Sequence, residues 1–328
     1  MADTFPKEFS VRAPSMDDME AVADLIEVCK MTDSGGIDYT IEDLRVDWDN
    51  PEFNLDTDAW IVTGPGEDII GYAMMFNREN VRLYVLAYVH PEHCGRGIGT
   101  HLARIGETRA RQQVPEAPPD LRVTLHNVVS NTNDAARRLL EGEGYTLVRH
   151  FWRMQIDMDK APPEPEWPDE IAVRRFIPGQ DERAVFDAIE EAFEDHWGHI
   201  PWRFETWRQV MTEREDFDPS LWFLAVDGDQ IAGGLLCYNY ANEGWVDVLA
   251  VRRAWRRRGL GLALLHHAFR TLYRREQRRV TLGVDSQNTT GATRLYERAG
   301  MHAAHQYDNY EKVLRPGKDP VIQLEPGS

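Results

Sequence analysis

The hydrophobic positions in the second half of the chain predict an ordered series of strands and helices. Residues 171–176 alternate apolar and polar side chains, as a strand with one exposed face does. Residues 181–193 place apolar side chains three and four positions apart, as an amphipathic helix does. Two apolar runs, 221–226 and 230–238, flank an Asp-Gly turn and predict a β-hairpin, which residues 245–251 follow as a third strand.

The rest of this half completes the pattern. Residues 260–273 predict a helix that begins on two glycines, and residues 280–284 predict another strand. A helix over 291–299 and a closing strand around 310–314 follow. Strands and helices in this order predict a mixed sheet with flanking helices, the α/β class.

The first half of the chain repeats the second. The matching pairs, each separated by 162 residues, are Arg12 and Arg174, Trp60 and Trp222, Gly71 and Gly233, Asn77 and Asn239, Val89 and Val251, and Gly97 and Gly259. Self-similarity at one offset indicates a duplicated structural unit. The segment between the halves is rich in proline and charge, as exposed linkers are. We therefore predict domains at 1–158 and 171–328, joined by a linker at 159–170.

Composition excludes several classes of function. The chain has 37 Lys and Arg against 55 Asp and Glu, a formal charge of −18, which disfavours nucleic acid and anionic membrane surfaces as partners. Its three cysteines have no C-x-x-C spacing, so no metal site is predicted and a reducing cytoplasm fits. No signal-peptide pattern and no apolar stretch of about 18 residues occurs. The sequence predicts no oligomeric state.

The motif with the most chemical content follows the strand at 245–251. The run Arg256-Arg257-Arg258-Gly259-Leu260-Gly261-Leu262 gives a basic turn and a helix that opens on glycines. Glycine permits close backbone approach, and the N–H groups of a first helical turn lack intrahelical acceptors, so this turn predicts a pyrophosphate site. The run lacks the third glycine of a dinucleotide fold and the Gly-Lys-Ser/Thr of a P-loop.

These residues resemble a known family. Arg-x-x-Gly-x-Gly after Leu249-Ala250-Val251 resembles the acyl-coenzyme A signature of GNAT N-acetyltransferases, and the resemblance continues from Asn288 through Leu-Tyr296-Glu to Gly300. The tandem arrangement most resembles the mycothiol-synthase-like group. The resemblance implies two tandem GNAT domains, each a mostly antiparallel sheet with a splayed central strand pair and flanking helices, and acetyl-coenzyme A as cofactor.

The resemblance also implies roles for single residues. Tyr296 stands at the general-acid position, and Asp247 stands where a carboxylate often deprotonates the amine through water. A phenol, with an ordinary pKa of about 10, keeps its proton at neutral pH. The implied coenzyme A contacts are Leu249, Ala250, Val251, Arg256, Arg257, Arg258, Gly259, Leu260, Gly261, Leu262 and Asn288. Each role has a structural alternative: a core tyrosine, an aspartate that faces water or an arginine, and an asparagine that caps the following helix.

The first half keeps the glycines of the motif but lacks the residues to which the resemblance assigns catalytic roles. Cys94 stands where the second half has Arg256, Val85 where it has Asp247, and Leu140 where it has Tyr296. A second coenzyme A could use Ala87, Val89, Gly95, Arg96, Gly97, Gly99 and Thr100. We therefore expect catalysis in the second half and a catalytically degenerate first half.

The acceptor is expected to meet the segment after the first helix of the second half. Asp195, His196 and Trp197 offer a carboxylate, an imidazole and an indole, which suit a cationic or sugar-like amine. His196 could equally be a structural hydrogen-bonding residue. The resulting expectation is an acetyl-coenzyme A-dependent N-acetyltransferase that acts on the primary amine of a small acceptor. The alternatives are acetylation of a cysteinyl-glucosaminyl-inositol precursor, as a mycothiol synthase does, and non-catalytic binding of acyl-coenzyme A.

Overall fold

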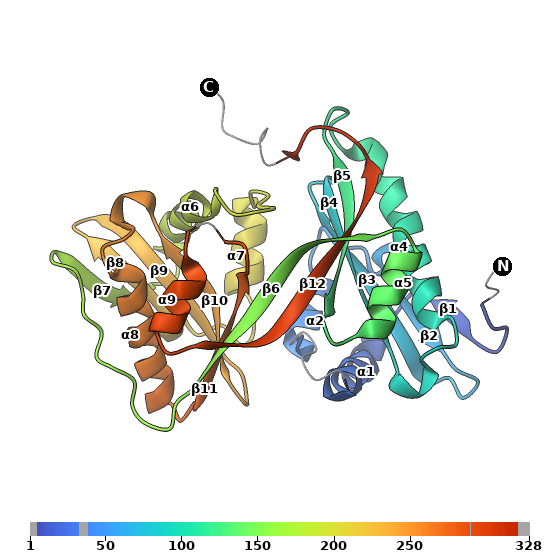
Figure 1. The fold of residues 1–328 in the computed structure, drawn as a ribbon, viewed down its shortest axis with the longest axis horizontal. Coiled ribbons are helices and arrows are strands. Elements are labelled where there is room, and N and C mark those ends of the chain that lie inside the picture. Colours follow the sequence, from blue (N-terminus) through green and yellow to red (C-terminus); the bar gives the residue numbers. More distant parts are fainter. Residues whose placement is uncertain (1–4, 33–38, 289, 321–328) are drawn as a thin grey trace. The chain divides into compact units, whose positions relative to one another are not determined.

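A computed structural model describes residues 5–32, 39–288 and 290–320 of the chain (Figure 1). The chain divides into two compact units. The first unit contains the described residues up to 150 together with those from 306 onward, and the second unit contains residues 151–305. Among the described residues, no helix has both the length and the apolar character that a membrane span needs.

The first unit is a mixed sheet with helices on its faces. Its elements are β1 (Ser10–Arg12), α1 (Met19–Thr32), α2 (Ile41–Trp48), α3 (Leu55–Asp58), β2 (Ala59–Thr63), β3 (Ile69–Arg78), β4 (Arg82–Val89), α4 (Ile98–Gln113), β5 (Val123–Ser130), α5 (Asp134–Gly142) and most of β12 (His302–Arg315). The strand order is β1-β2-β3-β4-β5-β12. Only β4 and β5 pair in parallel; the other neighbours are antiparallel.

The second unit repeats this arrangement. Its elements are most of β6 (Thr146–Asp157), β7 (Ile171–Arg175), α6 (Glu182–Phe193), α7 (Phe204–Thr212), β8 (Trp222–Asp227), β9 (Gln230–Asn239), β10 (Gly244–Val251), α8 (Leu260–Arg274), β11 (Arg279–Asp285) and α9 (Ala292–Arg298). The strand order is β6-β11-β10-β9-β8-β7, with β10 and β11 parallel. The mixed α/β fold expected from the sequence is confirmed. α7 was not expected from the sequence, although its buried Trp207 and Met211 are spaced as on one helical face.

The closing strand of each half of the sequence completes the sheet of the other unit. Residues 151–157 of β6 pair antiparallel with β11, and residues 307–315 of β12 pair antiparallel with β5. The units therefore differ from the expected domains, 1–158 and 171–328, at these strands. Hydrophobic periodicity identifies a strand but not its partner. In a duplicated chain, two similar sheet edges are available to each closing strand.

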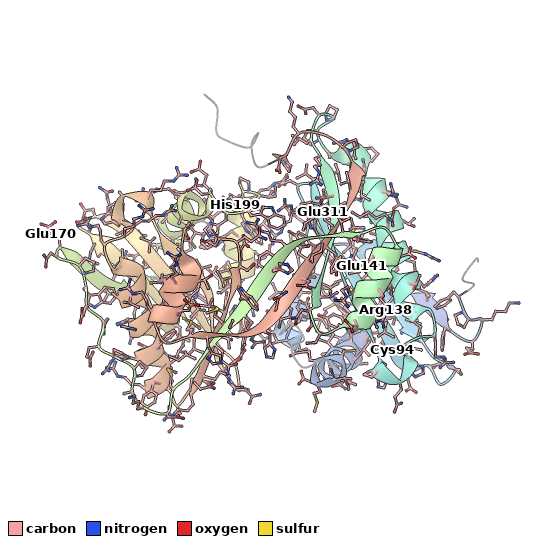
Figure 2. The ribbon with its side chains drawn as sticks, in the orientation of Figure 1. Cys94, Arg138, Glu141, Glu170, His199 and Glu311 are labelled. Atoms are coloured by element: carbon pink, nitrogen blue, oxygen red, sulfur yellow. The ribbon has the colours of Figure 1, made fainter. Side chains whose placement is uncertain are left out.

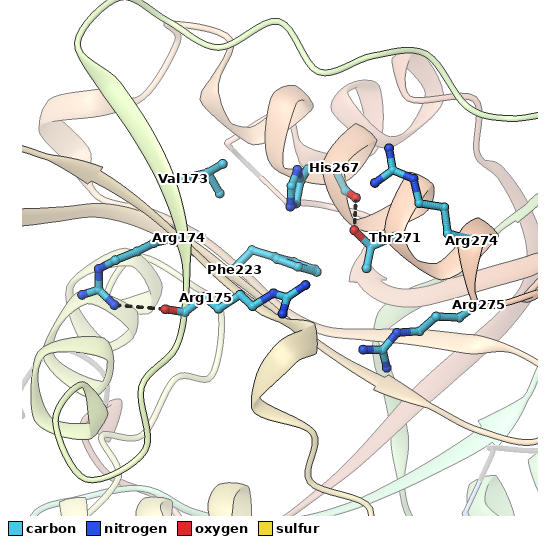
Figure 3. A pocket seen from close by; sticks show the side chains of 8 residues that line it. All are labelled: Val173, Arg174, Arg175, Phe223, His267, Thr271, Arg274 and Arg275. Carbon is cyan, nitrogen blue, oxygen red and sulfur yellow. Dashed lines mark hydrogen bonds between the residues drawn. The ribbon is translucent and has the colours of Figure 1, made fainter.

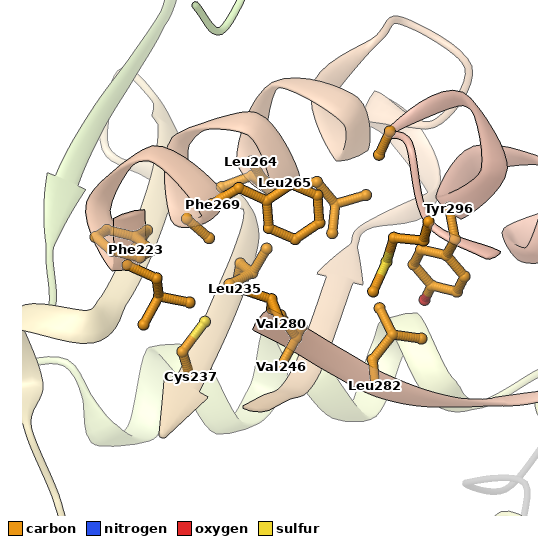
Figure 4. Close-up of a cluster of buried hydrophobic side chains, with 14 of the residues drawn as sticks. Phe223, Leu235, Cys237, Val246, Leu264, Leu265, Phe269, Val280, Leu282 and Tyr296 are labelled. Carbon is orange, nitrogen blue, oxygen red and sulfur yellow. The ribbon is translucent and has the colours of Figure 1, made fainter. Parts of the chain in front are cut away.

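Each face of the second sheet carries its own hydrophobic core. On one face, α8 packs Leu264, Leu265 and Phe269 against the strands (Figure 4). On the other face, Trp207 of α7 packs with the fully buried Trp222 of β8. Burial of one such large apolar side chain contributes roughly 1.5–3 kcal/mol. These cores fix α8 against the sheet, and α8 carries the glycine motif at its first turn.

The predicted linker is packed along α8 rather than detached from it. Residues 158–170 contain no helix or strand, as expected from their prolines. Trp167 meets the ring of His267 edge-on at 5.7 Å, and Arg270 donates a hydrogen bond of 2.6 Å to the Pro162 carbonyl. Arg270 also pairs with Glu164.

Candidate active site

The turn between β10 and α8, the glycine turn (residues 256–261), presents unpaired backbone donors. Gly259 caps α8 with a φ of 88°, and its carbonyl accepts from the N–H groups of Leu262 and Ala263 at 3.1 Å. The five N–H groups of residues 257–261 donate to no other described residue. Convergent free amides at the positive end of a helix bind anions. The backbone donors that the predicted pyrophosphate site needs are therefore unpaired in the described structure.

The three arginines of the glycine turn differ in their surroundings. Arg256 donates to the carbonyls of Val251 and Ala192 at 3.0 Å each, so it braces the turn against β10 and α6. Arg257 and Arg258 are exposed, and no described residue pairs with either side chain. They are free to contact phosphate, whereas Arg256 largely positions the backbone.

Two glycines of this region are required for different reasons. Gly259 adopts a left-handed backbone conformation that residues with a side chain rarely take. A Cβ on Gly261 would lie 3.0 Å from Leu295, so its absence lets α8 and α9 approach closely. Arg257 also has a positive φ, 63°, at a cost of about 1–2 kcal/mol for a residue with a side chain.

The central strands diverge as the resemblance implied. β10 pairs with β11 at only two positions, Gly244 with Val280 and Trp245 with Thr281. On its other side, β10 remains paired with β9 as far as Val251. The side of Leu249–Val251 that faces away from β9 therefore has no strand partner, and its backbone is available to an extended ligand arm.

Asp247 occupies a β-bulge in β10. Val246 lies opposite Cys237 and Val248 lies opposite Leu236, so Asp247 is the additional residue between them. Bulges re-aim a side chain out of the regular alternation. The Asp247 carboxylate is exposed and accepts a hydrogen bond of 3.1 Å from the Trp245 indole.

Tyr296 lies on the inner face of α9 within the core beneath α8 (Figure 4). Burial raises the pKa of Tyr296 to about 12. Its hydroxyl makes no hydrogen bond to a described residue, and it is not among the fully covered polar atoms that lack a partner. The ring is therefore buried in the core, and the phenol is protonated at neutral pH. Both the core position and an available proton are present.

Asn288 does not cap α9. Its side-chain oxygen accepts from the backbone N–H of Thr290 at 2.8 Å, a local Asx turn, while Gly291 occupies the N-cap position. The capping alternative is thus wrong at this position. The half-buried side chain stays in the loop between β11 and α9.

The residues expected to meet the acceptor divide into two groups. Asp195 is paired with Arg253 at 2.7 Å and with Arg256 at 3.4 Å, so its carboxylate stabilises the basic turn. His196 stacks on Phe193 with ring centroids 4.4 Å apart, and burial lowers its pKa. Trp197 is half-buried, 6.3 Å from the ring of Phe151. Only the imidazole and the indole remain as candidate acceptor contacts.

Sequence reasoning missed the second brace of the turn. Glu191 of α6 pairs with Arg252 at 2.6 Å and accepts from the Arg253 backbone N–H at 3.3 Å. Trp255 donates its indole N–H to Asp227 at 2.8 Å. Nothing in the spacing of Glu191 marked it, because it lies on the polar face of an ordinary amphipathic helix.

The first unit has the same turn with different side chains (residues 94–99). Gly95 and Gly97 have φ values of 78° and 83°. Arg96 lies 4.6 Å over the ring of Phe9, pairs with Glu8 and contacts His93. Cys94 is exposed on the turn (Figure 2).

The remaining positions proposed for a second coenzyme A lie around this turn. β4 pairs with β5 only from Arg82 to Tyr84, so Ala87 and Val89 lie on the diverging part. A Cβ on Gly99 would lie 3.1 Å from Leu139, the same packing role as Gly261 in the second unit. Thr100 is half-buried in the first turn of α4.

The structure refines two correspondences between the units. Leu140 does match Tyr296: in each case the carbonyl accepts a hydrogen bond of 2.9 or 3.0 Å from the residue five positions later. Val85 lies opposite Met75 as Val246 lies opposite Cys237, so Asp247 has no counterpart in β4. The bulge is an addition in the second unit, and the match between Asp247 and Val85 is wrong.

Comparison with known proteins assigns the chain to a family. The model of the acetyltransferase (GNAT) family matches residues 21–145 and again residues 183–301. The chain belongs to the GNAT family. It is an N-acetyltransferase that contains the family's domain twice. Within its described residues, no group of three or more His, Cys, Asp or Glu side chains is arranged to hold a metal ion.

Several proteins resemble this GNAT acetyltransferase over most of its length. The mycothiol acetyltransferase of Streptomyces scabiei is 33% identical over 72% of this chain and 74% of its own. The mycothiol acetyltransferase of Streptomyces avermitilis is 32% identical over 76% of this chain and 77% of its own. A GCN5-related N-acetyltransferase from Sphaerobacter thermophilus, known from a crystal structure, is 42% identical in sequence. The two structures superpose with a TM-score of 0.81 over 97% of this chain and 99% of the other. A tandem GNAT protein from the clavulanic acid biosynthesis pathway shares the fold, with a TM-score of 0.72 at 16% identity.

Proposed function

We propose that this GNAT acetyltransferase transfers the acetyl group of acetyl-coenzyme A to the primary amine of a small cationic or amino-sugar-like acceptor, and that the chemistry belongs to the second unit. The carrying observation is that one unit combines the open glycine turn, the diverging part of β10, and two polar groups, Tyr296 and Asp247, that the first unit lacks.

The residues of the second unit fit coenzyme A. The free N–H groups of residues 257–261, with the unpaired Arg257 and Arg258, suit a pyrophosphate. The unpaired backbone edge of Leu249–Val251 suits the pantetheine arm, with Asn288 in the loop beyond β11. Bound acetyl-coenzyme A would supply the thioester acetyl group.

Tyr296 and Asp247 would manage the two protons of the reaction. With a pKa of about 12, Tyr296 holds its proton at neutral pH and can give it to a departing thiolate, whose thiol has a pKa of about 8.5. An ordinary aspartate, with a pKa of about 3.9, is too weak a base to take a proton from an ammonium group directly. Asp247 would therefore act through a water molecule, which its exposure permits.

The relatives favour a more specific acceptor. Curated proteins named mycothiol acetyltransferase match this chain at up to 33% identity over about three quarters of their length. We therefore propose a cysteinyl-glucosaminyl-inositol amine as the first acceptor to test, with His196 and Trp197 as its aromatic contacts. Asp195 would act at a distance, through Arg253 and Arg256.

The cell compartment proposed for this reaction is a reducing cytoplasm. Cys29, Cys94 and Cys237 are all free thiols, which such a compartment preserves. The charge of −18 supports small molecules, rather than nucleic acid or anionic membranes, as partners.

The test is a screen for acetyl-coenzyme A consumption over an amine library that includes this precursor, with Tyr296→Phe as the critical variant. We expect thiol release with the wild-type protein and a loss of about a hundredfold in kcat for Tyr296→Phe, the scale of general acid catalysis. Tyr273→Phe on α8 is the matched control and should retain full activity. Unchanged turnover in Tyr296→Phe would remove the assigned acid. Tight coenzyme A binding with no turnover on any amine would favour the non-catalytic alternative.

A further inference from the structure

A second pocket lies in the second unit, away from the glycine turn. It has a volume of about 380 Å³ and is bordered by β7, β8 and the C-terminal half of α8 (Figure 3). Its residues on α8 extend from His267, about 9 Å along the helix from Gly261, to Arg274, about 20 Å from it. Its size lies within the range of small-molecule sites.

The pocket combines positive charge with an aromatic floor. Arg175, Arg274 and Arg275 line it together with the rings of Phe223 and His267, which meet edge-on at 4.7 Å. Figure 3 shows the fourth arginine, Arg174, turned away from them. Its guanidinium is paired with Asp181 at 2.6 Å.

Two of the three pocket arginines have no counterion among the described residues. Arg275 pairs with Asp218 at 2.6 Å. Arg175 and Arg274 are exposed, and neither guanidinium has an ion pair or hydrogen bond to any residue that the structure describes. Burial lowers the pKa of His267, and the charges of Arg274 and Arg175 lower it further, so both arginines act on the same ring. Like charges gathered around one cavity repel each other unless an anion joins them.

Helix electrostatics explains only part of this cluster. Cations in the last turn of a helix interact favourably with its dipole, which accounts for Arg274 and Arg275. Arg175 lies on strand β7 and gains nothing from that dipole.

The first unit provides an internal reference. At the offset of 162 residues that relates α4 to α8, Ala13 stands in place of Arg175 and Gln112 in place of Arg274. Both replacements are uncharged. The shared fold therefore does not require charge at these positions, and the charge is specific to the second unit.

We propose that this pocket binds a small ligand that carries a doubly negative oxyanion, a phosphate monoester or a dicarboxylate, between Arg175 and Arg274, with its body beside the half-buried ring of His267. Planar guanidinium groups bind phosphate and carboxylate oxygens through paired N–H donors, so both ligand types share this chemistry. The site is separate from the proposed coenzyme A site and does not depend on it.

The test is isothermal titration of the full chain with inorganic phosphate and, separately, with succinate at constant ionic strength. With coenzyme A present to occupy the glycine turn, we expect one further anion per chain, and at least about tenfold weaker binding of it in Arg175→Gln/Arg274→Gln, because each charge-assisted hydrogen bond contributes about that much. The probe that binds more tightly identifies the ligand type. Arg278→Gln, which removes a neighbouring exposed charge that does not line the pocket, should stay within about twofold of wild type.

A third variant separates this pocket from the glycine turn. Arg257→Gln/Arg258→Gln should leave the anion binding described here unchanged. Loss in that variant with retention in Arg175→Gln/Arg274→Gln would assign the anion to the glycine turn and overturn the proposal. Equally weakened anion binding in Arg278→Gln would show a general effect of positive charge and contradict the proposed pocket. Absence of binding by either probe to the wild-type protein would also overturn it.

Discussion

The two units have the same glycine turn but differ in the side chains around it. Gly97 and Gly259 cap their helices with φ values of 83° and 88°. In the first unit, Arg96 is held by a carboxylate and two aromatic rings. In the second unit, Arg257 and Arg258 have no described partner. Both units therefore have the glycine-capped helix start, but only the second unit has turn arginines without a described partner.

The central strands show the same division. In the first unit, β3 and β4 pair without interruption from Gly71 with Val89 to Arg78 with Arg82. In the second unit, the corresponding pairing is broken by the bulge at Asp247. The comparison teaches that a duplicated scaffold can keep the glycines needed for its backbone while only one copy carries Tyr296 and Asp247, the groups that we propose move protons.

The largest expected effect comes from a carboxylate placed in the turn. Gly259→Asp should weaken coenzyme A binding by about a hundredfold or more, because a negative charge at the helix start repels the pyrophosphate by several kcal/mol. Gly97→Asp in the first unit is the matched change and should leave kcat/KM within about threefold. Steady-state kinetics with varied acetyl-coenzyme A measures both, and equal losses in the two variants would make the units equivalent.

The bulge should matter next. Asp247→Asn keeps the size and the hydrogen bond from Trp245 but removes the charge, so we expect kcat/KM for the amine to fall by about tenfold or more. The loss should be largest at low pH, where less of the amine is already neutral. A rate that does not respond to this substitution at any pH would leave Asp247 with a structural role only.

The units should also respond differently to acid. Burial lowers the pKa of His126 in the first unit to about 3, from an ordinary value of about 6.5. The neutral form is favoured in the folded state, so stability is present above pH 6.5 and is lost as the pH falls from there toward 3, by about 1.4 kcal/mol per pH unit. Hydrogen-exchange protection, calculated against the intrinsic exchange rate at each pH, should therefore fall in β5 and β12 at pH 5 before it falls in the second unit.

Glu311 makes the acid prediction sharper. Its carboxylate lies 3.7 Å from His126 Nε2 and would favour protonation of the ring, against the effect of burial. We expect burial to dominate because Glu311 is already paired with Arg122. His126→Gln should flatten the pH dependence of exchange in β5. If acid lowered hydrogen-exchange protection in the second unit first, the first unit would not be the more acid-sensitive one.

The smallest effect concerns backbone strain. Arg257→Gly should stabilise the protein by about 1 kcal/mol, because the positive φ of 63° suits glycine, which the first unit has at the same place. The same change should raise KM for acetyl-coenzyme A a few-fold through the lost charge. Denaturant unfolding and steady-state kinetics report the two effects separately. A gain in stability without a change in KM would show that Arg257 does not contact the cofactor.

Local signals in the sequence were sufficient for most of the fold. The alternation in β7, the Asp-Gly hairpin and the glycines at the start of α8 depend on neighbouring residues alone, and each was predicted at its position. α7 was not predicted, although Trp207 and Met211 have the spacing of one helical face. The strand exchange was missed because pairing depends on a partner that is distant in sequence.

The site was predicted less completely than the fold. In a β-bulge, two residues of one strand lie opposite a single residue of the neighbouring strand. The bulge at Asp247 therefore cannot be recognised from the sequence of β10 alone. The bonds of Arg256 to Val251 and Ala192, and the pairing of Asp195 with Arg253, arise from tertiary approach that no spacing encodes. The helix start at Gly259 could be predicted because its anion-binding groups are backbone N–H groups, whose position the local glycine pattern determines.

The most direct test of the central claim is the binding of coenzyme A to two matched variants. The account predicts that Arg257→Gln/Arg258→Gln weakens the tighter binding event by about tenfold or more in isothermal titration, while Arg96→Gln leaves that event unchanged. Loss of the tighter event in Arg96→Gln, with full retention in Arg257→Gln/Arg258→Gln, would place the working site in the first unit and contradict the account.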